Sequence, residues 1–328
     1  MWLSNSSVGR KFIMAITGAV LVLFLTFHCL MNAVAIAWPA AYNSVCLFLG
    51  ANWYALIASA GLAAFIVVHI IYAVMLTLQN RRARGHERYA VSHRPKSVEW
   101  SSQNMLVLGI VILAFLVVHM IQFWAKMQLV EILGEHTKIP AAAGTLFLQE
   151  AFQQPWTLIV YCIGFIALWF HLNHGIWSMF QSVGWDSTVW IPRLKKIGAW
   201  WCSIVVVLFI AEAIVFTVNA NRHFYLNDPE LREQYKDMVV PEYEDDFGPA
   251  AVQALSSASY DDYVQMVKGQ YQQMQNPQAA SYFGDKYEGM INFLQHQVDF
   301  IDYLESYPAV DEEAVAPSTG VAAPSTQK

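Results

Sequence analysis

Four histidines lie one each inside four of the five long apolar segments of the chain. They are His28, His69, His119 and His171. A neutral imidazole presents a nitrogen lone pair, so it can bind a metal or carry a proton. Ionisable groups deep in an apolar segment are costly and usually functional, although a lone histidine there is also common as a hydrogen-bonded packing residue. These four side chains are the first candidates for the chemistry of the protein.

The segments around these histidines are long enough to cross a membrane. Of the 328 residues 56% are hydrophobic and 13% are charged, which is too apolar for an ordinary soluble domain. About 20 apolar residues form a helix that spans a hydrocarbon core about 30 Å thick, and in lipid only helices satisfy the backbone of an isolated segment. The predicted fold is an all-α membrane protein. Its five-helix bundle is expected to have helices over residues 12–37, 52–80, 102–128, 156–181 and 197–220.

Basic residues gather on one side of this predicted bundle. Arginines and lysines precede the first helix and fill the connections between helices two and three and between helices four and five. The other side has only Lys126 and Lys138, and no charge in the turn expected around residues 39–51. A Lys/Arg excess marks the cytoplasmic face. We therefore expect the N-terminus in the cytoplasm and, after five crossings, the C-terminus outside.

The last third of the chain differs in character from the first 220 residues. From Asn221 onward it has 18 acidic and 6 basic residues, a net charge of −12. We expect residues 221–313 to form an acidic extramembrane extension of short amphipathic helices, such as 260–274 and 287–304, that pack weakly. Residues 314–328 are rich in Ala, Pro, Ser and Thr and are expected to be disordered. An acidic solvated tail and an external docking surface for another subunit both remain open.

Several classes of function have no support in the sequence. No Cys-x-x-Cys-His motif for covalent haem, phosphate-binding loop, dinucleotide-binding glycine pattern or hydrolase elbow is present. The four cysteines show no disulfide framework. Basic residues cluster only where membrane topology explains them, so no nucleic-acid partner is expected.

Counting residues along the predicted helices places the histidines at two depths. At about 1.5 Å per residue, His28 and His119 lie roughly 25 and 27 Å along helices that run outward. His69 and His171 lie roughly 24–26 Å along helices that run inward. The first pair shares an outer level and the second an inner level. Two b haems, each held by two axial histidines, follow from this arrangement. His174, three residues beyond His171, is an alternative ligand.

At these residues the chain resembles the single-chain, five-helix, dihaem cytochrome b membrane anchor of succinate dehydrogenase and fumarate reductase. Residues 1–220 carry the resemblance. It rests on the four histidines and on three motifs: Asn5-Ser6-Ser7-Val8-Gly9-Arg10-Lys11, Met14-Ala15-x-Thr17-Gly18, and His171-Leu172-Asn173-His174-Gly175 followed by Gly184-Trp185. The resemblance implies that His171 rather than His174 is the ligand. It also implies pairing of helix one with three and of helix two with four, in a bacterial cytoplasmic (inner) membrane.

The resemblance further implies partners and cofactors. A flavoprotein with FAD and an iron–sulfur subunit would bind the cytoplasmic face and interconvert succinate and fumarate. The anchor would carry electrons between the iron–sulfur clusters and a membrane quinone, with menaquinone expected, through its two b haems. Assembly into a higher oligomer remains open.

Polar groups near the membrane faces are candidates for quinone and proton chemistry. Ser6, Ser7, Arg10 and residues 100–103 could contact quinone at the inner entrance, or could cap helices and contact lipid headgroups. Glu212 is the only carboxylate well inside a predicted membrane helix, near the outer level. It could transfer protons to a quinone site there, or serve as a neutral, hydrogen-bonded packing group.

Two other functions are compatible with buried histidines. One is a dihaem cytochrome b anchor of another quinone-linked oxidoreductase, such as a hydrogenase, formate dehydrogenase or nitrate reductase. These commonly take their ligands as pairs from fewer helices, so one histidine on each of four helices disfavours them. The other is a haem-free transporter with a histidine proton relay, for which internal repeats or helices broken at the midplane are expected and not evident.

Overall fold

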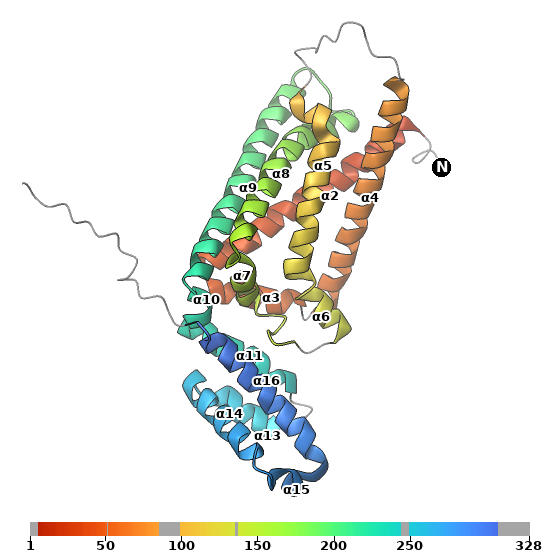
Figure 1. The fold of residues 1–328 in the computed structure, drawn as a ribbon. Coiled ribbons are helices and arrows are strands. Elements are labelled where there is room, and N and C mark those ends of the chain that lie inside the picture. Colours follow the sequence, from red (N-terminus) through yellow and green to blue (C-terminus); the bar gives the residue numbers. More distant parts are fainter. Residues whose placement is uncertain (1–5, 51, 85–98, 135–136, 244–248, 308–328) are drawn as a thin grey trace, which may run out of the picture.

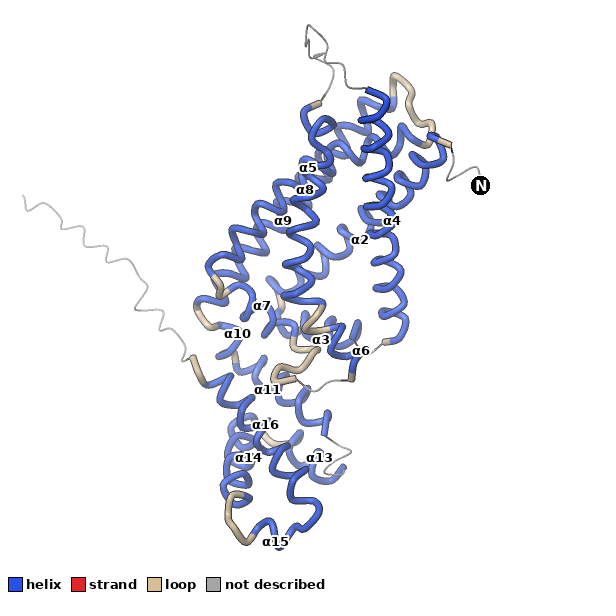
Figure 2. Tube along the Cα trace, turned by 45° about the vertical axis from the view of Figure 1, so that its right-hand side comes forward, coloured by secondary structure: helices blue, strands red, loops and turns tan. Residues whose placement is uncertain are grey.

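The computed structural model describes residues 6–50, 52–84, 99–134, 137–243 and 249–307, and these residues are all-α with no strands (Figures 1 and 2). Five of the helices are long and apolar enough to cross a membrane. They are α2 (Ser7–Ala37), α4 (Trp53–Arg84), α5 (Trp100–His119), α8 (Pro155–Ser182) and α9 (Trp190–Asn221). The predicted fold class is confirmed. The fifth helix begins at Trp190, seven residues before the predicted start.

Local sequence explains where two of these long helices, α2 and α8, begin. The Ser6 side chain accepts a hydrogen bond of 2.9 Å from the backbone N–H of Gly9 and caps α2. Pro155 occupies the first turn of α8, where the absent N–H costs no helical hydrogen bond. After His119, α5 continues as the π-helix η1 (Met120–Trp124), so the third apolar helix extends unbroken to Trp124.

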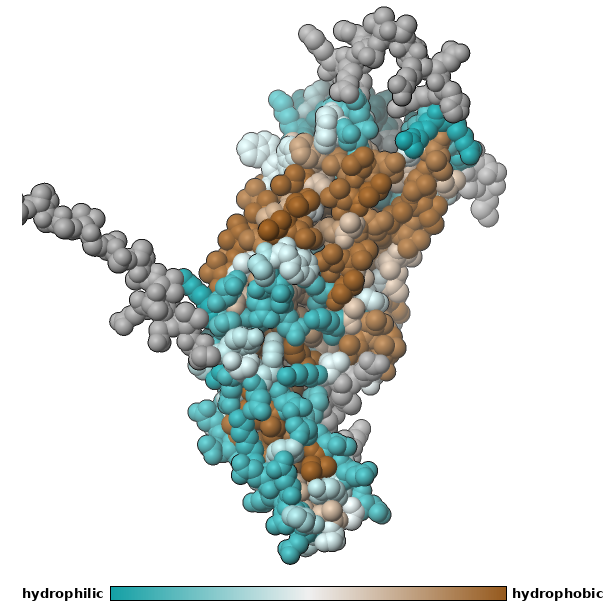
Figure 3. All heavy atoms as spheres, viewed as in Figure 1, coloured by the Kyte–Doolittle hydropathy of each residue, from teal (hydrophilic) through white to brown (hydrophobic). Residues whose placement is uncertain are grey.

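The outer surface of the five long helices is largely apolar. Large side chains are exposed there, including Ile57 at 61%, Ile159 at 62% and Val207 at 63%. Figure 3 shows a brown, hydrophobic band on this face of the bundle between two hydrophilic ends. A soluble protein would not expose so wide an apolar surface, whereas a hydrocarbon environment solvates it.

Helix α8 is the centre of the bundle, since it packs against α2, α5 and α9. Gly164 on α8 permits its close approach to α5, because a Cβ there would lie 2.5 Å from Cγ of Phe115. Helix α4 packs mainly on α2, and none of its described side chains is buried. Helix α4 is not closely packed against α8, and α2 is not closely packed against α5.

Three short helices close the end of the bundle opposite the N-terminus: α3 (Pro39–Gly50), α6 (Gln128–Leu133) and α7 (Gly144–Phe152). The turn expected around residues 39–51 was therefore wrong, since the segment is a twelve-residue helix. Helix α7 is buried at all but one of its positions. Its Gln149 amide donates to the carbonyl of Ala220 at 2.7 Å, which ties this short helix to the end of α9.

The chain after α9 folds into a helical C-terminal domain, residues 224–307. Its elements are α10 (Phe224–Asn227), α11 (Pro229–Val239), η2 (Val240–Tyr243), α13 (Pro249–Ser257), α14 (Tyr260–Met274), α15 (Ala279–Phe283), η3 (Gly284–Lys286) and α16 (Tyr287–Glu305). Helix starts at Pro229 and Tyr260 are capped by Asp228 and Ser259. The predicted disordered tail at 314–328 lies outside the described residues.

The expectation that these C-terminal helices pack weakly was wrong. They share a core of fully buried side chains: Tyr225, Leu226, Leu231, Tyr235, Val239, Tyr263, Val267, Phe300, Ile301 and Leu304. The amphipathic pattern was visible in the sequence, but the partner of each apolar face is distant along the chain. Because the apolar faces of these helices are buried against one another, the segment forms a domain rather than a set of separate surface helices.

A buried polar network joins this domain to the bundle. Asn43 of α3 accepts hydrogen bonds of 2.9 Å from the N–H and hydroxyl of Thr145, and its amide donates to Oε1 of Gln234 at 3.0 Å. The Thr145 hydroxyl also lies 2.7 Å from the Tyr235 hydroxyl. Because Asn43, Thr145 and Tyr235 are fully buried, these bonds fix the domain on the bundle end opposite the N-terminus.

Candidate functional site

The four histidines face one another in two pairs inside the bundle. The rings of His28 on α2 and His119 on α5 are 5.8 Å apart, centre to centre, and nearly perpendicular at 85°. The rings of His69 on α4 and His171 on α8 are 6.3 Å apart, at 56°. The structure thus brings together the same pairs that were expected from depth along the helices.

The ring spacing of both pairs fits two imidazoles on opposite faces of one metal. A metal–nitrogen bond is about 2 Å and the ring centre lies about 1 Å beyond the nitrogen, so two such rings are roughly 6 Å apart. No group of three or more His, Cys, Asp or Glu side chains that could hold a bare metal ion occurs in the described part of the chain. Pairs of imidazoles instead suit a metal with in-plane ligands of its own, as in haem.

The two pairs lie at different depths, and two helices measure the separation independently. On α2, Thr17 contacts His69 of one pair, and His28 belongs to the other. On α8, Tyr161 contacts His119 of one pair, and His171 belongs to the other. Intervals of eleven and ten residues correspond to about 16 and 15 Å at the α-helical rise. The agreement between α2 and α8 sets the levels roughly half a membrane core apart.

Packing around the histidines leaves each pair between helices rather than within a helix–helix contact. His28 and His119 are carried by α2 and α5, and His69 and His171 by α4 and α8, the helices that are not closely packed together. A flat group could therefore lie between the paired rings without breaking a contact between closely packed helices. This arrangement fits a planar cofactor better than it fits a packing role for four histidines.

Aromatic side chains surround the outer pair. Phe24 stacks on His28 at 5.3 Å, and Phe209 lies 6.1 Å from the same ring. Phe115 and Phe123 lie 6.0 and 5.3 Å from His119. Such a wall excludes water, which keeps the imidazoles neutral and therefore able to bind a metal.

One detail at each level departs from a simple ligand pair. The Asn32 side-chain amide nitrogen lies 3.3 Å from Nε2 of His28, so that amide must turn away before Nε2 could bind a metal. Nδ1 of His171 is buried and has no hydrogen-bond partner among the described residues. The contact of Asn32 with His28 can be relieved by rotation of the Asn32 side chain. At His171 no hydrogen bond from a described residue to Nδ1 helps to orient the ring.

His174 does not face His69. Its Nδ1 lies 3.3 Å from Oε2 of Glu99, whose other oxygen accepts a 2.7 Å hydrogen bond from Nζ of Lys195. Burial acts against ionisation of Glu99, but the hydrogen bonds from Lys195 and His174 outweigh it and lower the pKa of this carboxyl. The ion-pair cluster occupies His174, so the structure leaves His171 as the histidine opposite His69.

Glu212 is buried inside α9, with 2% of its surface exposed. The thiol of Cys29 donates to its Oε1 at 3.8 Å, and Cys29 follows His28 directly in the chain. Phe209, which contacts His28, lies about one turn before Glu212 on the same helix. The carboxyl is therefore close to the level of the outer pair, as the sequence indicated.

The candidates at the inner entrance are spread over two helix starts. Ser6 caps α2, Ser7 is exposed and Arg10 is half-buried. On α5, Trp100 packs against Phe170 with ring centres 5.2 Å apart. The structure gives these side chains helix-terminal positions at one end of the bundle and does not gather them into one pocket.

Sequence reasoning missed the side chains that hold the histidines. Thr17 Oγ1 lies 3.0 Å from Nδ1 of His69, and the Tyr161 hydroxyl lies 3.2 Å from Nδ1 of His119. Thr17 could have been found, because eleven residues before His28 is three helical turns and the same face of the helix. Nothing in the sequence alone distinguishes Tyr161 from other apolar-segment tyrosines.

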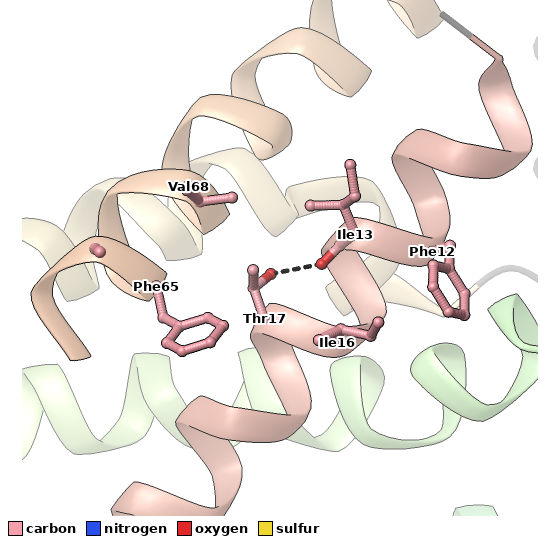
Figure 4. A pocket seen from close by; sticks show the side chains of 7 residues that line it. Phe12, Ile13, Ile16, Thr17, Phe65 and Val68 are labelled. Carbon is pink, nitrogen blue, oxygen red and sulfur yellow. Dashed lines mark hydrogen bonds between the residues drawn. The ribbon is translucent and has the colours of Figure 1, made fainter. Parts of the chain in front are cut away.

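Two cavities occur in the described part of the structure, and one of them lies beside the inner histidine pair. One, of about 290 Å³, opens between α2 and α4 beside Thr17 and is lined by Phe12, Ile13, Ile16, Thr17, Ala64, Phe65 and Val68 (Figure 4). The other, of about 440 Å³, lies at the opposite end and includes Glu131 and Asp237 in its lining. Burial raises the pKa of Glu131, and its Oε2 has no hydrogen-bond partner among the described residues. Glu131 was not among the candidates expected from the sequence.

The fold defines a class, a multi-pass α-helical membrane protein, with five helices in the described residues that are able to cross a membrane. The chain matches no protein-family profile, no curated protein and no solved structure.

Proposed function

We propose that the chain is a dihaem cytochrome b membrane anchor, which carries electrons between a partner at its inner face and a membrane quinone. The strongest support is the presence of two pairs of facing histidines, whose ring centres are 5.8 and 6.3 Å apart. In this proposal His28 and His119 ligate an outer haem b, and His69 and His171 an inner one.

Bound haem would supply a one-electron redox centre at each level. The protein supplies four imidazoles, aromatic side chains around the outer pair, and a separation of the two levels that is set along α2 and α8. Electrons could then cross most of the bundle in two steps. Apolar surroundings and axial histidines are also the means by which a protein sets a haem potential.

The inner end offers a cationic surface for soluble partners. Arg81, Arg82, Arg193 and Lys196 are exposed there. We propose that it binds an iron–sulfur subunit and a flavoprotein with FAD, which interconvert succinate and fumarate, as the resemblance implies. Arg88, Arg94 and Lys96, which also support this orientation, lie outside the described residues. The localisation proposed is a bacterial cytoplasmic membrane with the N-terminus inside.

Quinone chemistry needs groups that exchange protons near a haem. At the outer level Glu212 is buried and contacts Cys29, the residue that follows the proposed ligand His28 in the chain. We propose that it transfers protons for quinone, with menaquinone as the expected species. Ser6, Ser7 and Arg10 are the proposed contacts at the inner entrance, where Ser6 already has a structural role as a helix cap.

Haem analysis and quinol oxidation together test this proposal. The full chain is purified in detergent, haem is quantified per chain from reduced-minus-oxidised optical spectra, and reduction by a menaquinol analogue is followed in proteoliposomes. Two b haems per chain, both reducible by quinol, are expected. Two haems without quinol reduction would favour a different electron donor, whereas a chain without haem would return the histidines to proton relay or packing.

A further inference from the structure

At each level, one histidine of the pair is held at Nδ1 by a hydroxyl group from another helix. Thr17 of α2 lies 3.0 Å from Nδ1 of His69 on α4. Tyr161 of α8 lies 3.2 Å from Nδ1 of His119 on α5. The direction of the two hydrogen bonds decides what the imidazoles can do, because only the nitrogen without a proton can bind a metal.

The hydroxyl of Thr17 has a single proton, and its other neighbours are acceptors. Oγ1 lies 2.9 Å from the carbonyl oxygen of Ile13, on the preceding turn of α2 (Figure 4). It also lies 3.1 Å from the carbonyl oxygen of Met14. Carbonyl oxygens cannot donate, so the proton of Thr17 points to them. The hydroxyl oxygen then accepts from Nδ1–H of His69.

The hydroxyl proton of Tyr161 is likewise used by another acceptor, here a side-chain oxygen. Its hydroxyl donates to Oε1 of Gln122 at 2.9 Å. The amide of Gln122 presents its oxygen to Tyr161 and its nitrogen to Thr157, and Nε2 donates to Oγ1 of Thr157 at 3.2 Å. With its only proton committed to Gln122, Tyr161 accepts from Nδ1–H of His119.

Both hydrogen bonds therefore favour the same tautomer. A proton on Nδ1 leaves the lone pair on Nε2, the nitrogen farther from the backbone. A hydrogen bond from Nδ1–H to an acceptor also makes the imidazole a stronger donor to a metal, as in other second-shell contacts. Of the remaining two histidines, His171 has an Nδ1 without a partner among the described residues, and His28 contacts Asn32 through Nε2.

We propose that Thr17 and Tyr161 are positioning residues, which fix the Nδ1–H tautomers of His69 and His119 and set the potentials of the two haems separately. The inference rests on the proposed function. Thr17 sits on α2, which carries a ligand of the outer haem, and Tyr161 sits on α8, which carries a ligand of the inner haem. Each of these helices thus holds a ligand at one level and orients a ligand at the other.

The sign of the effect follows from the donor strength of the ligand. A more basic imidazole stabilises oxidised iron, so the present hydrogen bonds lower the potential of their haem, and removing one raises it. If a lost bond changes the relative affinity for oxidised and reduced iron tenfold, the shift is about 59 mV for a one-electron couple.

The test is an optical redox titration of the full chain and of four variants with haem bound. Thr17→Val removes the hydroxyl with little change of shape, Tyr161→Phe does the same for the ring, and Thr17→Ser restores a hydroxyl. Thr217→Val is the matched control, because Thr217 donates to Ala213 O at 2.7 Å as a plain helix back-bond without contacting a histidine. The inner and outer haems are assigned with His69→Ala and His119→Ala.

Thr17→Val is expected to raise only the inner potential, and Tyr161→Phe only the outer one, by roughly the shift of a tenfold affinity change. Thr17→Ser and Thr217→Val should match the unmodified protein. Loss of the inner haem from Thr17→Val but not from Thr17→Ser would also support positioning. Unchanged potentials, or equal shifts of both haems in each variant, would overturn the inference while leaving the dihaem proposal intact. No haem in the unmodified chain would remove the proposed function itself.

Discussion

The histidines could be found from sequence because their cost in an apolar segment makes them stand out, and their levels followed from the constant rise of a helix. Their neighbours could not. The choice of His171 over His174 was left open by spacing alone. In the structure His171 faces His69, whereas His174 lies against Glu99, which pairs with Lys195; both partners lie on other segments.

Glu99 should make the stability of the protein depend on pH. Because its pKa is lowered in the folded protein by Lys195 and His174, the ionised carboxylate stabilises the fold above its ordinary pKa of 4.5. This contribution is lost as the pH falls through the lowered value. The unmodified protein should unfold at a higher temperature than Glu99→Gln at pH 7, and the difference should shrink toward pH 4.

Thermal unfolding in detergent measures this difference. Glu150→Gln is a suitable control, since it removes the carboxylate of the Lys126–Glu150 pair, 2.6 Å long, at the other end of the bundle. A difference for Glu99→Gln that stays constant or grows on acidification would contradict the account of Glu99.

Long helices were predictable from the length of their apolar segments, whereas short ones were not. Helices α3 and α7 are too short to be distinguished from loops by periodicity, and their burial depends on neighbours far along the chain. The same limit explains the error in the C-terminal domain, where the pattern of amphipathic helices was read correctly but their mutual packing was missed. Buried Tyr235 and Phe300 lie in helices separated by nearly fifty residues.

Gly164 is the position where α5 and α8 approach most tightly among the glycines of these two helices. In Gly164→Ala the new methyl group would lie 2.5 Å from the ring of Phe115, so the helices must move apart at a cost of about 1–3 kcal/mol. Since Tyr161 and His119 bridge the same two helices, the proposed outer haem should also be lost more readily.

Gly109→Ala on α5 is the matched control for this change, because a Cβ there has nothing within 4 Å. Thermal unfolding and haem content are measured for both variants. Equal behaviour of the two would show that the contact between Gly164 and Phe115 does not set the spacing of α5 and α8.

The molecule has two chemically different ends. Exposed basic residues lie at the N-terminal end, and the C-terminal domain is fixed at the other end by the Asn43–Thr145–Tyr235 network. Sequence predicted the charge asymmetry, but the rigid attachment of the domain depends on buried hydrogen bonds between residues 90 or more positions apart.

This polarity predicts opposite exposure of two surface positions. Asp285 in the C-terminal domain and Lys196 at the start of α9 are both exposed, and all four natural cysteines are buried or half-buried. A membrane-impermeant thiol reagent should label Asp285→Cys in intact cells and Lys196→Cys only after the membrane is opened. The parent chain measures background labelling. Labelling in the opposite order would invert the proposed topology.

The most direct test of the central claim is the haem spectrum of four single variants: His28→Ala, His69→Ala, His119→Ala and His171→Ala. The account predicts that the first and third lose one b haem, that the second and fourth lose the other, and that His174→Ala keeps both. Loss of the same haem by His28→Ala and His171→Ala, or an unmodified chain without haem, would contradict it.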